Sequence, residues 1–520
     1  MAIYSFSPFG YEGALVEIEV DLRRGIPAVD IVGLADGAVK ESRERMKAAI
    51  RNSGFELPSE RVIISLSPAD LKKEGAGFDL PVALEVLKKQ SILYESLDED
   101  VAKEMAETNV LVIGELELSG KVRPVKAIHG ACETAKSVGI EYAIVPKGSD
   151  VPHGIKYCEV ETLKEAFETL LNIGSDKYFK EKGEEEMEGF STEDNVIFDD
   201  VSDDESLDRI EGHNGLKMAM AVAVAGRHNI LAYGAPGCGK TMVLQRMYQL
   251  MPRMTFDEAQ SVTRIYSLAG LIGQNESYIK RRPFRMPHQT ASIEEICGGG
   301  PNCRPGEISL AHNGVLFLDE AAEFRSSVLQ MLRVPLESHC ITLSRAGRCT
   351  VYPANFQLVM AANPCPCGNY LSKDKLCLCS EKSVEQYWRK FGAPLLDRIG
   401  IRFNANEGEE IGDDYSLSNL RSRIKRAMER QYKRQGKLNQ DLEPMYVLEY
   451  CRMTDGAKSL LDEITKKQGL SPREVVNITK IARTIADMLD LEESDVITER
   501  HLELALNLHG KLPEGVENCL

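Results

Sequence analysis

The feature that most constrains the fold of this chain is a glycine-rich turn between an apolar run and a helical pattern. The apolar run 230–233 leads into GAPGCGKT, which fits G-x-x-x-x-G-K-[ST]. Glycines in such a turn let backbone N–H groups approach phosphates, and the following helix adds its dipole. The predicted nucleotide-binding residues are Gly234, Ala235, Pro236, Gly237, Cys238, Gly239, Lys240, Thr241 and Met242. We expect Lys240 to reach the β- and γ-phosphates and Thr241 to ligate Mg²⁺.

Two later apolar runs end in polar residues of the type that completes such a site. Val315–Leu318 is followed by Asp319, which can hold the Mg²⁺ shell, and by Glu320, which can polarise the attacking water. The run 359–362 is followed by Asn363, which could orient that water or sense the γ-phosphate. Near-continuous apolar runs between helical segments predict a parallel sheet covered on both faces.

Length and pattern predict about three domains in the 520 residues. Residues 1–171 have a mixed α/β pattern, with strands expected at 14–22, 61–67 and 109–118, and a helix at 36–54 that Asp36 caps and Gly54 ends. Residues 209–405 contain the nucleotide motifs, and 406–520 read as helices. There is no apolar run of the ~18 residues that a membrane helix needs. The N-terminus has no secretory pattern and the thirteen cysteines are no disulfide scaffold, so we expect a cytoplasmic protein and no membrane partner.

Residues 172–208 are predicted to be an acidic linker. Within 180–206, twelve residues are acidic and two are basic, so this stretch holds −10 of the formal net charge of −17. Such a segment repels itself and lacks large apolar residues, which favours an extended, mobile connection. The net charge is therefore a poor guide to local basic surfaces elsewhere.

Four cysteines lie close together in the sequence, at 365, 367, 377 and 379. Four thiolates suit a closed, tetrahedral structural Zn²⁺ site with no open position for catalysis. The C-x-C spacing departs from the usual C-x₂₋₄-C, so reduced free thiols and a redox disulfide stay open as alternatives. The four candidate zinc ligands are Cys365, Cys367, Cys377 and Cys379.

The motifs together resemble the ComM/YifB group of magnesium-chelatase-like AAA+ ATPases, the competence-associated helicase relatives. The residues that carry the resemblance are GAPGCGKT, RRPFRMPHQTAS, VLFLDE, PLESHCITLSRAG, VYPANFQLVMAANPCPCG, PLLDRIGI and ARTIADMLDL. The resemblance implies an α/β fold, with an AAA+ P-loop parallel sheet, a helical lid and an N-terminal α+β Lon-protease-like domain. It also implies a hexameric ring, an arginine finger at Arg398 that acts on the next subunit's ATP, and a phosphate sensor at Arg473.

The resemblance places the Lon-like domain at 1–171 and predicts that it is not a protease. Active Lon proteases use a Ser-Lys dyad, and here Gly77 falls at the serine position and His129 at the lysine position. Without a nucleophile and its base there is no covalent route to peptide cleavage. Lys126 lies near enough in the sequence to replace the base under a shifted alignment, but nothing replaces the serine.

Three basic segments are candidates for DNA contact without sequence preference. The first, 280–288, contains Arg282 and Arg285; the second, 341–351, reads as a hairpin with Arg345 and Arg348 beside its turn. Family resemblance implies that both inserts face a central channel. The third, 421–437, holds eight cations and one acid, which also fits an ordinary solvated helix face.

These features favour an ATP-driven DNA motor with ATP and Mg²⁺ as cofactors, acting by resemblance in branch migration during recombination of incoming DNA. A chelatase-type motor and a protein-remodelling ATPase are the alternatives, separable by which ligand stimulates ATP hydrolysis. His213, near the expected adenine position, has no role that the sequence explains.

Overall fold

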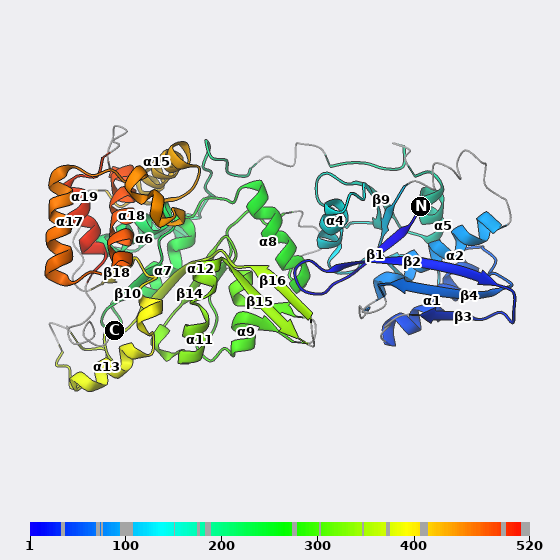
Figure 1. The fold of residues 1–520 in the computed structure, drawn as a ribbon, viewed down its shortest axis with the longest axis horizontal. Helices are drawn as coiled ribbons and strands as arrows, with labels where there is room; N and C mark the ends of the chain where they lie inside the picture. Colours follow the sequence, from blue (N-terminus) through cyan, green and yellow to red (C-terminus); the bar gives the residue numbers. More distant parts are fainter. Residues whose placement is uncertain are drawn as a thin grey trace.

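The computed structural model describes residues 1–32, 37–68, 73, 76–93, 108–149, 151–173, 177–182, 189–272, 278–300, 303–345, 348–370, 375–405, 414–489 and 496–510. The molecule is elongated, with the N-terminal domain at one end and the helical lid at the other (Figure 1). The AAA+ core lies between them.

The N-terminal domain is built on a seven-stranded mixed sheet in the order β3-β4-β2-β1-β5-β8-β9. The strands are β1 (Ile3–Ser7), β2 (Ala14–Arg23), β3 (Val29–Val32), β4 (Arg61–Ser67), β5 (Val110–Val112), β8 (Tyr142–Pro146) and β9 (Lys156–Val160), with a small hairpin of β6 (Glu115–Leu116) and β7 (Val122–Arg123). The helices are α1 (Gly37–Asn52), α2 (Asp79–Leu93), α4 (Ile128–Ser137) and α5 (Leu163–Leu171).

The strands predicted at 14–22 and 61–67 and the helix predicted at 36–54 correspond to β2, β4 and α1, but the single strand predicted at 109–118 is wrong, because β5 and β6 are two short strands of different sheets. Along β2, Val16, Ile18 and Val20 are buried while their neighbours are more exposed, as alternation requires. Gly54 has a φ of 85°, and the helix ends just before it, since a left-handed residue stops an α-helix. The predicted cap, Asp36, lies outside the described residues.

The AAA+ core is a five-stranded parallel sheet in the order β11-β14-β17-β10-β18. The strands are β10 (Ile230–Tyr233), β11 (Phe284–Arg285), β14 (Val315–Leu318), β17 (Gln357–Ala362) and β18 (Ile401–Asn404). Alternate residues of β10, β14 and β17 enter two separate apolar clusters, one on each face of the sheet. The predicted parallel sheet with both faces covered is therefore confirmed.

Short helices and two hairpins surround this sheet. The helices are α6 (Asn214–Gly226), α7 (Lys240–Gln245), α8 (Phe256–Ala269), α9 (Ile293–Cys297), α10 (Glu307–Leu310), α11 (Ser326–Met331), α12 (Pro335–Ser338), α13 (Glu381–Arg389) and α14 (Ala393–Leu396). The hairpins are β12 (Gly298–Gly299) with β13 (Arg304–Pro305), and β15 (Cys340–Arg345) with β16 (Arg348–Pro353). Helix α6 and the lid pack on one face of the sheet, and α9, α11 and α13 on the other.

The lid contains α15 (Leu417–Gln435), α16 (Val447–Tyr450), α17 (Asp455–Gln468), α18 (Pro472–Leu489) and α19 (Glu499–Leu508). A buried cluster of charged side chains joins the two longest helices of the lid, α15 and α18. Asp487 is fully buried and accepts hydrogen bonds from Arg434 Nη1 at 2.8 Å and Arg483 Nη2 at 2.7 Å. Two further cations of α15 donate to backbone carbonyls, Arg421 to Gln249 and Arg430 to Asp487. The basic run 421–437 is thus not simply a solvated face.

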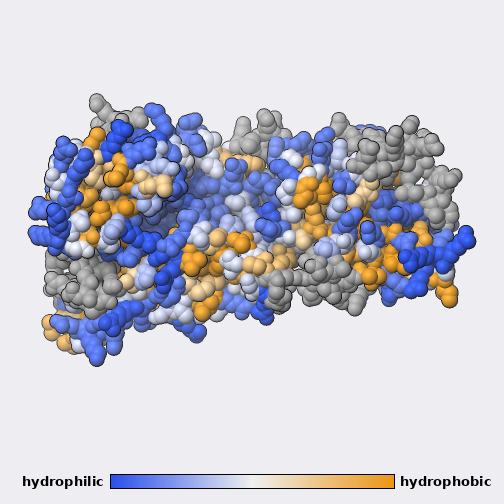
Figure 2. Space-filling model, viewed as in Figure 1, coloured by the Kyte–Doolittle hydropathy of each residue, from blue (hydrophilic) through white to orange (hydrophobic). Residues whose placement is uncertain are grey.

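Within the described residues, every helix is too short or too polar to cross a bilayer. Hydrophilic residues cover much of the face seen in Figure 2, and the hydrophobic residues form separate patches.

The second half of the acidic segment is held against the AAA+ core, so the prediction of a free, mobile linker is wrong for residues 189–208. Phe190 is buried and packs edge-on against Phe256 at 5.4 Å. Asp199 accepts from Arg253 at 2.7 Å and pairs with Arg281 at 3.0 Å. Cations of the core neutralise this acid, so the expected self-repulsion does not hold the segment off the surface.

The N-terminal domain contacts the AAA+ core through α8 and the β15–β16 hairpin. Arg264 of α8 donates to the Tyr11 carbonyl at 3.1 Å and to Thr134 Oγ1 at 3.0 Å, and lies 4.6 Å from the centre of the Tyr11 ring. The Tyr11 N–H donates to Thr350 Oγ1 in β16 at 2.9 Å. Gly10 fits against the same threonine, because a β-carbon there would lie 2.1 Å from Oγ1.

The two positions matched to the Lon dyad face different surroundings. Gly77 packs near Ile113 and Val125. His129 is buried and lies edge-on to Tyr278 of the core at 5.4 Å, so it belongs to the contact between the domains. Lys126, the alternative base, points its Nζ toward Gly270 at the end of α8.

Candidate functional site

The glycine-rich turn 234–241, the P-loop, follows the carboxyl end of β10 and leads directly into α7. Gly237 and Gly239 have φ values of 77° and 82°, which only glycine adopts without strain. Lys240 is 7% exposed, and its Nζ donates to the carbonyls of Gly234 at 2.8 Å and Ala235 at 2.9 Å. The ammonium group thus lies inside the loop, at the position from which it can reach a bound phosphate.

His213 is explained by its contact with this loop. It precedes α6 with a φ of 55°, and a β-carbon on Gly239 would lie 2.8 Å from its Nε2. The imidazole therefore packs against the last glycine of the P-loop. The sequence marked this position only as unusual, because nothing local shows that it touches Gly239.

Thr241 and Asp319 meet at the end of the sheet. Thr241 Oγ1 donates to Asp319 Oδ1 at 2.9 Å, and the same oxygen accepts from the Glu320 N–H at 3.0 Å. A hydroxyl and a carboxylate at this distance can share one Mg²⁺. Glu320 is exposed, with a left-handed φ of 48°, which turns it out of the strand direction.

Asn363 lies at the same edge as these residues. Strand β17 lies between β14 and β10, with Ala362 opposite Tyr233 and Met360 opposite Leu318. Because the strands are parallel, their carboxyl ends place Asn363, Asp319 and the P-loop side by side. The site thus combines three motifs that are well separated in the chain, at 234–241, 319–320 and 363.

Arg398 lies at the opposite edge of the sheet. It precedes β18, and its carbonyl accepts from Asn229 Nδ2 at 2.9 Å, where Asn229 directly precedes β10. The P-loop follows β10, so a four-residue strand, about 13 Å long, separates the two positions.

Arg473 lies beside Arg398, because both pair with Glu337 of α12. The Arg473 Nη2 atom is 2.9 Å from Glu337 Oε1, and Arg398 binds the same oxygen. The two guanidinium groups, Arg473 first, lower the pKa of Glu337. Arg473 is thus held beside Arg398, away from the carboxyl ends of the strands, and its role as a phosphate sensor stays a prediction. Glu337 was not singled out from the sequence, where no local signal marks its two partners.

The four cysteines form one cluster, with all four sulfur atoms within 4.8 Å of one another. Cys365 Sγ is 3.4 Å from Cys367 Sγ and 3.7 Å from Cys377 Sγ. Tetrahedral zinc with bonds of about 2.3 Å separates its sulfur ligands by about 3.8 Å, so the arrangement fits zinc. A disulfide needs about 2.05 Å, and all described cysteines are free.

Two of the four arginines predicted to contact DNA form ion pairs with carboxylates of the core. Arg282 is 12% exposed and pairs with both carboxylate oxygens of Glu258, at 2.9 and 2.6 Å. It also donates to the carbonyls of Pro252 and Asn313. Arg285 forms a similar fork with Glu307 at 2.7 Å. The interpretation of Arg282 as a phosphate ligand is therefore wrong. The charge of Arg285 is neutralised by Glu307.

Arg345 and Arg348 end the two strands of the predicted hairpin. They lie opposite each other in the β15–β16 register, as the sequence predicted, and Arg345 is exposed. A cross-strand pair places both residues on one face of the hairpin. Of the four arginines predicted to contact DNA, this pair remains a candidate for phosphate contact.

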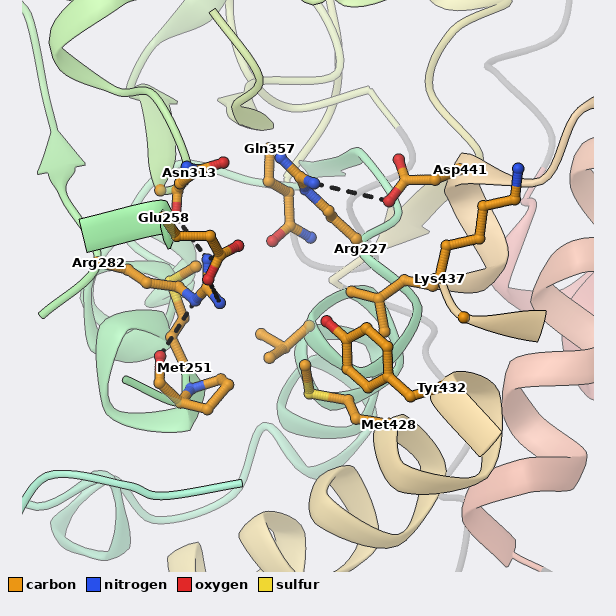
Figure 3. A pocket seen from close by; sticks show the side chains of 15 residues that line it. Arg227, Met251, Glu258, Arg282, Asn313, Gln357, Met428, Tyr432, Lys437 and Asp441 are labelled. Atoms are coloured by element: carbon orange, nitrogen blue, oxygen red, sulfur yellow. Dashed lines mark hydrogen bonds and ion pairs between the residues drawn. The ribbon is translucent and has the colours of Figure 1, made fainter. Parts of the chain in front are cut away.

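A pocket of about 130 Å³ lies between α15 and the amino ends of β14 and β17 (Figure 3). Four of its charged residues form two ion pairs, Arg282 with Glu258 and Arg227 with Asp441 at 3.6 Å, while Lys437 pairs with Glu443 outside the lining. Burial raises the pKa of Glu258, but the contact with Arg282 outweighs it and the net shift is downward. The pocket therefore differs from the phosphate site in two ways. It lies at the amino ends of the strands, and two of its arginines are neutralised by carboxylates of its own lining.

Family profiles match most of the chain. The profile "Magnesium chelatase, subunit ChlI" matches residues 206–411, "Subunit ChlI of Mg-chelatase" matches 18–149, and "Magnesium chelatase, subunit ChlI C-terminal" matches 415–509. The match to residues 206–411 contains the P-loop, Asp319 and Glu320, Asn363 and the cysteine cluster.

Full-length relatives agree with these matches. The chain is 34% identical to YifB of Escherichia coli and 35% identical to the competence protein ComM of Haemophilus influenzae, each over 97% of this chain and 96% of the relative. A shorter stretch of 169 residues is 25% identical to the DNA replication licensing factor Mcm2 of Drosophila melanogaster, and covers 30% of this chain and 17% of that protein. The chain therefore belongs to the ComM/YifB family of magnesium-chelatase-like AAA+ ATPases.

Proposed function

We propose that this chain is a ring-forming ATPase that moves along DNA and drives branch migration when incoming DNA is recombined. The observation that supports a ring most directly is the separation of Arg398 from the P-loop. An arginine at the far edge of the sheet cannot reach its own nucleotide, but it can reach the nucleotide of a neighbouring subunit. A hexamer closes such head-to-tail contacts into a ring.

Within one subunit, the residues at the carboxyl edge divide the work of hydrolysis. Lys240 binds the β- and γ-phosphates, and Thr241 with Asp319 holds Mg²⁺. Glu320 accepts a proton from the attacking water, and Asn363 orients that water against the γ-phosphate. Mg²⁺ supplies charge neutralisation between the phosphates when it is bound.

The neighbouring subunit supplies the positive charge that the transition state needs. Arg398 acts as the arginine finger, and Arg473 joins it, since Glu337 holds the two side by side. Both guanidinium groups would stabilise the charge that develops on the γ-phosphoryl oxygens. Arg473 is thus proposed as a sensor that acts on the next subunit and not on its own.

DNA contact is proposed for Arg345 and Arg348 at the tip of the β15–β16 hairpin. The exposed Arg345 at the end of β15, with Arg348 opposite it in the register, can track phosphates without reading bases. The printed names of two relatives, a competence protein and a replication licensing factor, favour a DNA substrate over a tetrapyrrole. A protein-remodelling ATPase remains the second candidate, because the N-terminal domain resembles a protease domain, and proteases act on polypeptides.

The cysteine cluster is proposed to hold structural Zn²⁺, and the N-terminal domain to serve assembly without cleaving peptides. Gly77 offers no hydroxyl nucleophile, whatever base stands near it. The sulfur geometry leaves no open coordination position for a catalytic water.

The test is ATP-dependent strand exchange on a labelled four-way DNA junction. We expect the wild type to resolve the junction and Lys240→Ala to be inactive, with activity falling as salt rises. Arg345→Ala combined with Arg348→Ala should lose DNA stimulation of ATP hydrolysis, while the exposed Arg23→Ala on the N-terminal domain should keep it. An ATPase that ignores DNA but responds to unfolded polypeptide would overturn the DNA motor in favour of protein remodelling.

A further inference from the structure

The cysteine cluster lies between the sensor strand and a helix that packs on the phosphate edge. Cys365 and Cys367 follow Asn363 at the end of β17. Cys377 and Cys379 precede Ser380, the N-cap of α13, whose side chain accepts from the Ser383 N–H. A metal held by both pairs therefore joins the end of β17 to the start of α13.

Helix α13 contacts the ends of the strands that carry the nucleotide motifs. Trp388 is fully buried, and its Nε1 donates to the Pro364 carbonyl at 3.0 Å, one residue after Asn363. Its ring lies edge-on to Tyr233 at 5.8 Å, and Tyr233 directly precedes the P-loop. Lys390, just after the helix, donates to the Ala322 carbonyl at 2.9 Å, two residues after Glu320.

The turn that carries the first cysteine pair also contacts the P-loop, through Gly368. Gly368 is buried with a φ of 77°, and its N–H donates to the Cys365 carbonyl at 3.0 Å. A β-carbon on Gly368 would lie 2.6 Å from Pro236 Cδ, so the turn that carries Cys367 rests against the P-loop. No larger residue than glycine fits between them.

The second cysteine pair packs against the apolar cluster on this face of the sheet, but its segment has few other anchors among the described residues. The described residues 366–370 and 375–379 contain neither helix nor strand. Leu376 and Leu378, on either side of Cys377, are 81% and 86% exposed, so neither anchors the segment in a core. The contact of Cys377 Sγ with Cys365 and Cys367, at 3.7 and 3.5 Å, is what a metal would turn into a strong link.

We propose that one zinc ion on Cys365, Cys367, Cys377 and Cys379 braces the P-loop and Asn363, so that zinc and ATP bind cooperatively. The proposal rests on the nucleotide-binding role proposed above, but not on any action on DNA. The four thiols lose their protons as the metal binds, and ATP binds best when α13 is held in place. Because coupling between two ligands is reciprocal, bound ATP must also slow the loss of zinc.

The first measurement is the metal content and ATP affinity of the full-length protein. We expect one zinc per chain, and cobalt substitution should give the absorption bands of tetrahedral thiolate coordination. Cys367→Ser should lose the metal and bind a fluorescent ATP analogue about tenfold more weakly. Cys349→Ser, which changes another exposed cysteine in β16, is the matched control and should retain both.

The second measurement tests reciprocity without changing a ligand. Zinc transfer from the wild type to a coloured chelator should be about tenfold slower with a non-hydrolysable Mg·ATP analogue than without it. In Lys240→Ala the same analogue should have no effect, which controls for metal binding by the nucleotide itself. Gly368→Ala should weaken nucleotide binding, whereas Gly139→Ala, with a similar φ of 83° and open space around it, should not.

Each outcome decides between the parts of the proposal. Absence of zinc together with absence of thiolate–cobalt bands would overturn the metal site. Zinc that leaves at the same rate with and without nucleotide, or unchanged ATP affinity in Cys367→Ser, would overturn the coupling. Failure of DNA strand exchange would leave all these readouts intact, because none of them involves DNA.

Discussion

At the scale of single residues, the nucleotide site depends on where each polar atom is held. Asp319 accepts from both Thr241 and the Glu320 N–H, so its carboxylate is fixed before Mg²⁺ arrives. Glu320 has no such restraint, since it is exposed and turned away from the strand. A fixed metal ligand beside a solvent-facing acid is the arrangement that separates metal binding from activation of water.

This difference predicts the effect of Glu320→Gln. The amide keeps the size of the side chain but cannot accept a proton from water, so ATP hydrolysis should fall by about 10²- to 10⁴-fold. ATP affinity should change little, because Lys240, Thr241 and Asp319 remain. Steady-state ATPase rates and binding of a fluorescent ATP analogue measure the two effects. Loss of binding in proportion to activity would contradict the assignment.

At the scale of elements, the lid is fastened by buried polar groups. Asp487 of α18 is fully buried between Arg434 of α15 and Arg483 of its own helix. Removing one member of such a group leaves charges without a partner in a low-dielectric interior. These contacts decide how α15 and α18 pack against each other within the lid.

Asp487→Ala should therefore destabilise the protein by about 3–5 kcal/mol. Asp455→Ala on α17 is the matched control, because its carboxylate is fully exposed and its pair with Lys458 is long, at 3.5 Å. Urea unfolding monitored by circular dichroism measures both variants. Equal stability of the two variants would show that the buried charged cluster contributes nothing to the free energy of unfolding.

Buried histidine makes the lid sensitive to acid. His228 contacts Thr484 at 2.8 Å and Gln440 at 3.0 Å, and burial lowers its pKa to about 4, against the small opposing effect of Gln440. Between pH 6.5 and 4 the unfolded chain takes up the proton and the folded chain does not, so stability falls as pH falls. This single group should remove about 2 kcal/mol between pH 7.5 and 5.

The comparison of His228→Gln with the wild type isolates this effect. The amide cannot be protonated, so the variant should lose less stability than the wild type when unfolding is measured at both pH values. His288→Gln, at an exposed position, should follow the wild type. An identical pH dependence in all three proteins would contradict the prediction.

The sequence predicted the elements well because their signals are local. Alternation along 14–22, the apolar runs before Lys240 and Asp319, and the hairpin around Arg345 each lie within ten residues of chain. The errors concern partners that lie far away. Nothing near Arg282 shows that Glu258 neutralises it, and nothing in the acidic segment shows that Arg253 and Arg281 meet Asp199.

At the scale of the whole molecule, the N-terminal domain rests on the hairpin proposed to touch DNA. Gly10 and Tyr11, in the turn between β1 and β2, contact Thr350 of β16. Arg345 lies in β15, the other strand of the same hairpin. We therefore expect a movement of the hairpin to be transmitted to the N-terminal domain.

Gly10→Val should loosen this contact. Its φ of 62° and the 2.1 Å distance from its β-carbon position to Thr350 Oγ1 leave no room for a side chain. Amide hydrogen exchange should rise in residues 9–13 and in β16. Gly148→Val is the control, because it has a similar φ of 75° with nothing within 4 Å. Equal exchange in β16 for the two variants would show that the domains are not coupled there.

The division of the catalytic residues between two edges predicts how subunits complement each other. Lys240→Ala lacks a working P-loop and Arg398→Ala lacks a working finger, so each should be inactive alone. When the two are mixed in equal amounts and allowed to assemble, some interfaces combine an intact P-loop from one with an intact arginine from the other. Random assembly in a ring makes this true of about a quarter of the interfaces, so ATPase activity should return to about that fraction of the wild type.

The same mixing experiment separates the roles of Arg398 and Arg473. If Arg473 acts with Arg398 on the neighbour, Arg473→Ala should also be complemented by Lys240→Ala. The double change of Arg398 and Arg473 should be complemented equally well, because Glu337 holds both at one interface. If Arg473 served the P-loop of its own subunit, mixing it with Lys240→Ala would restore no activity, since no site would hold both groups intact. The fraction of ATPase activity recovered thus reports on which edge of the sheet each arginine serves.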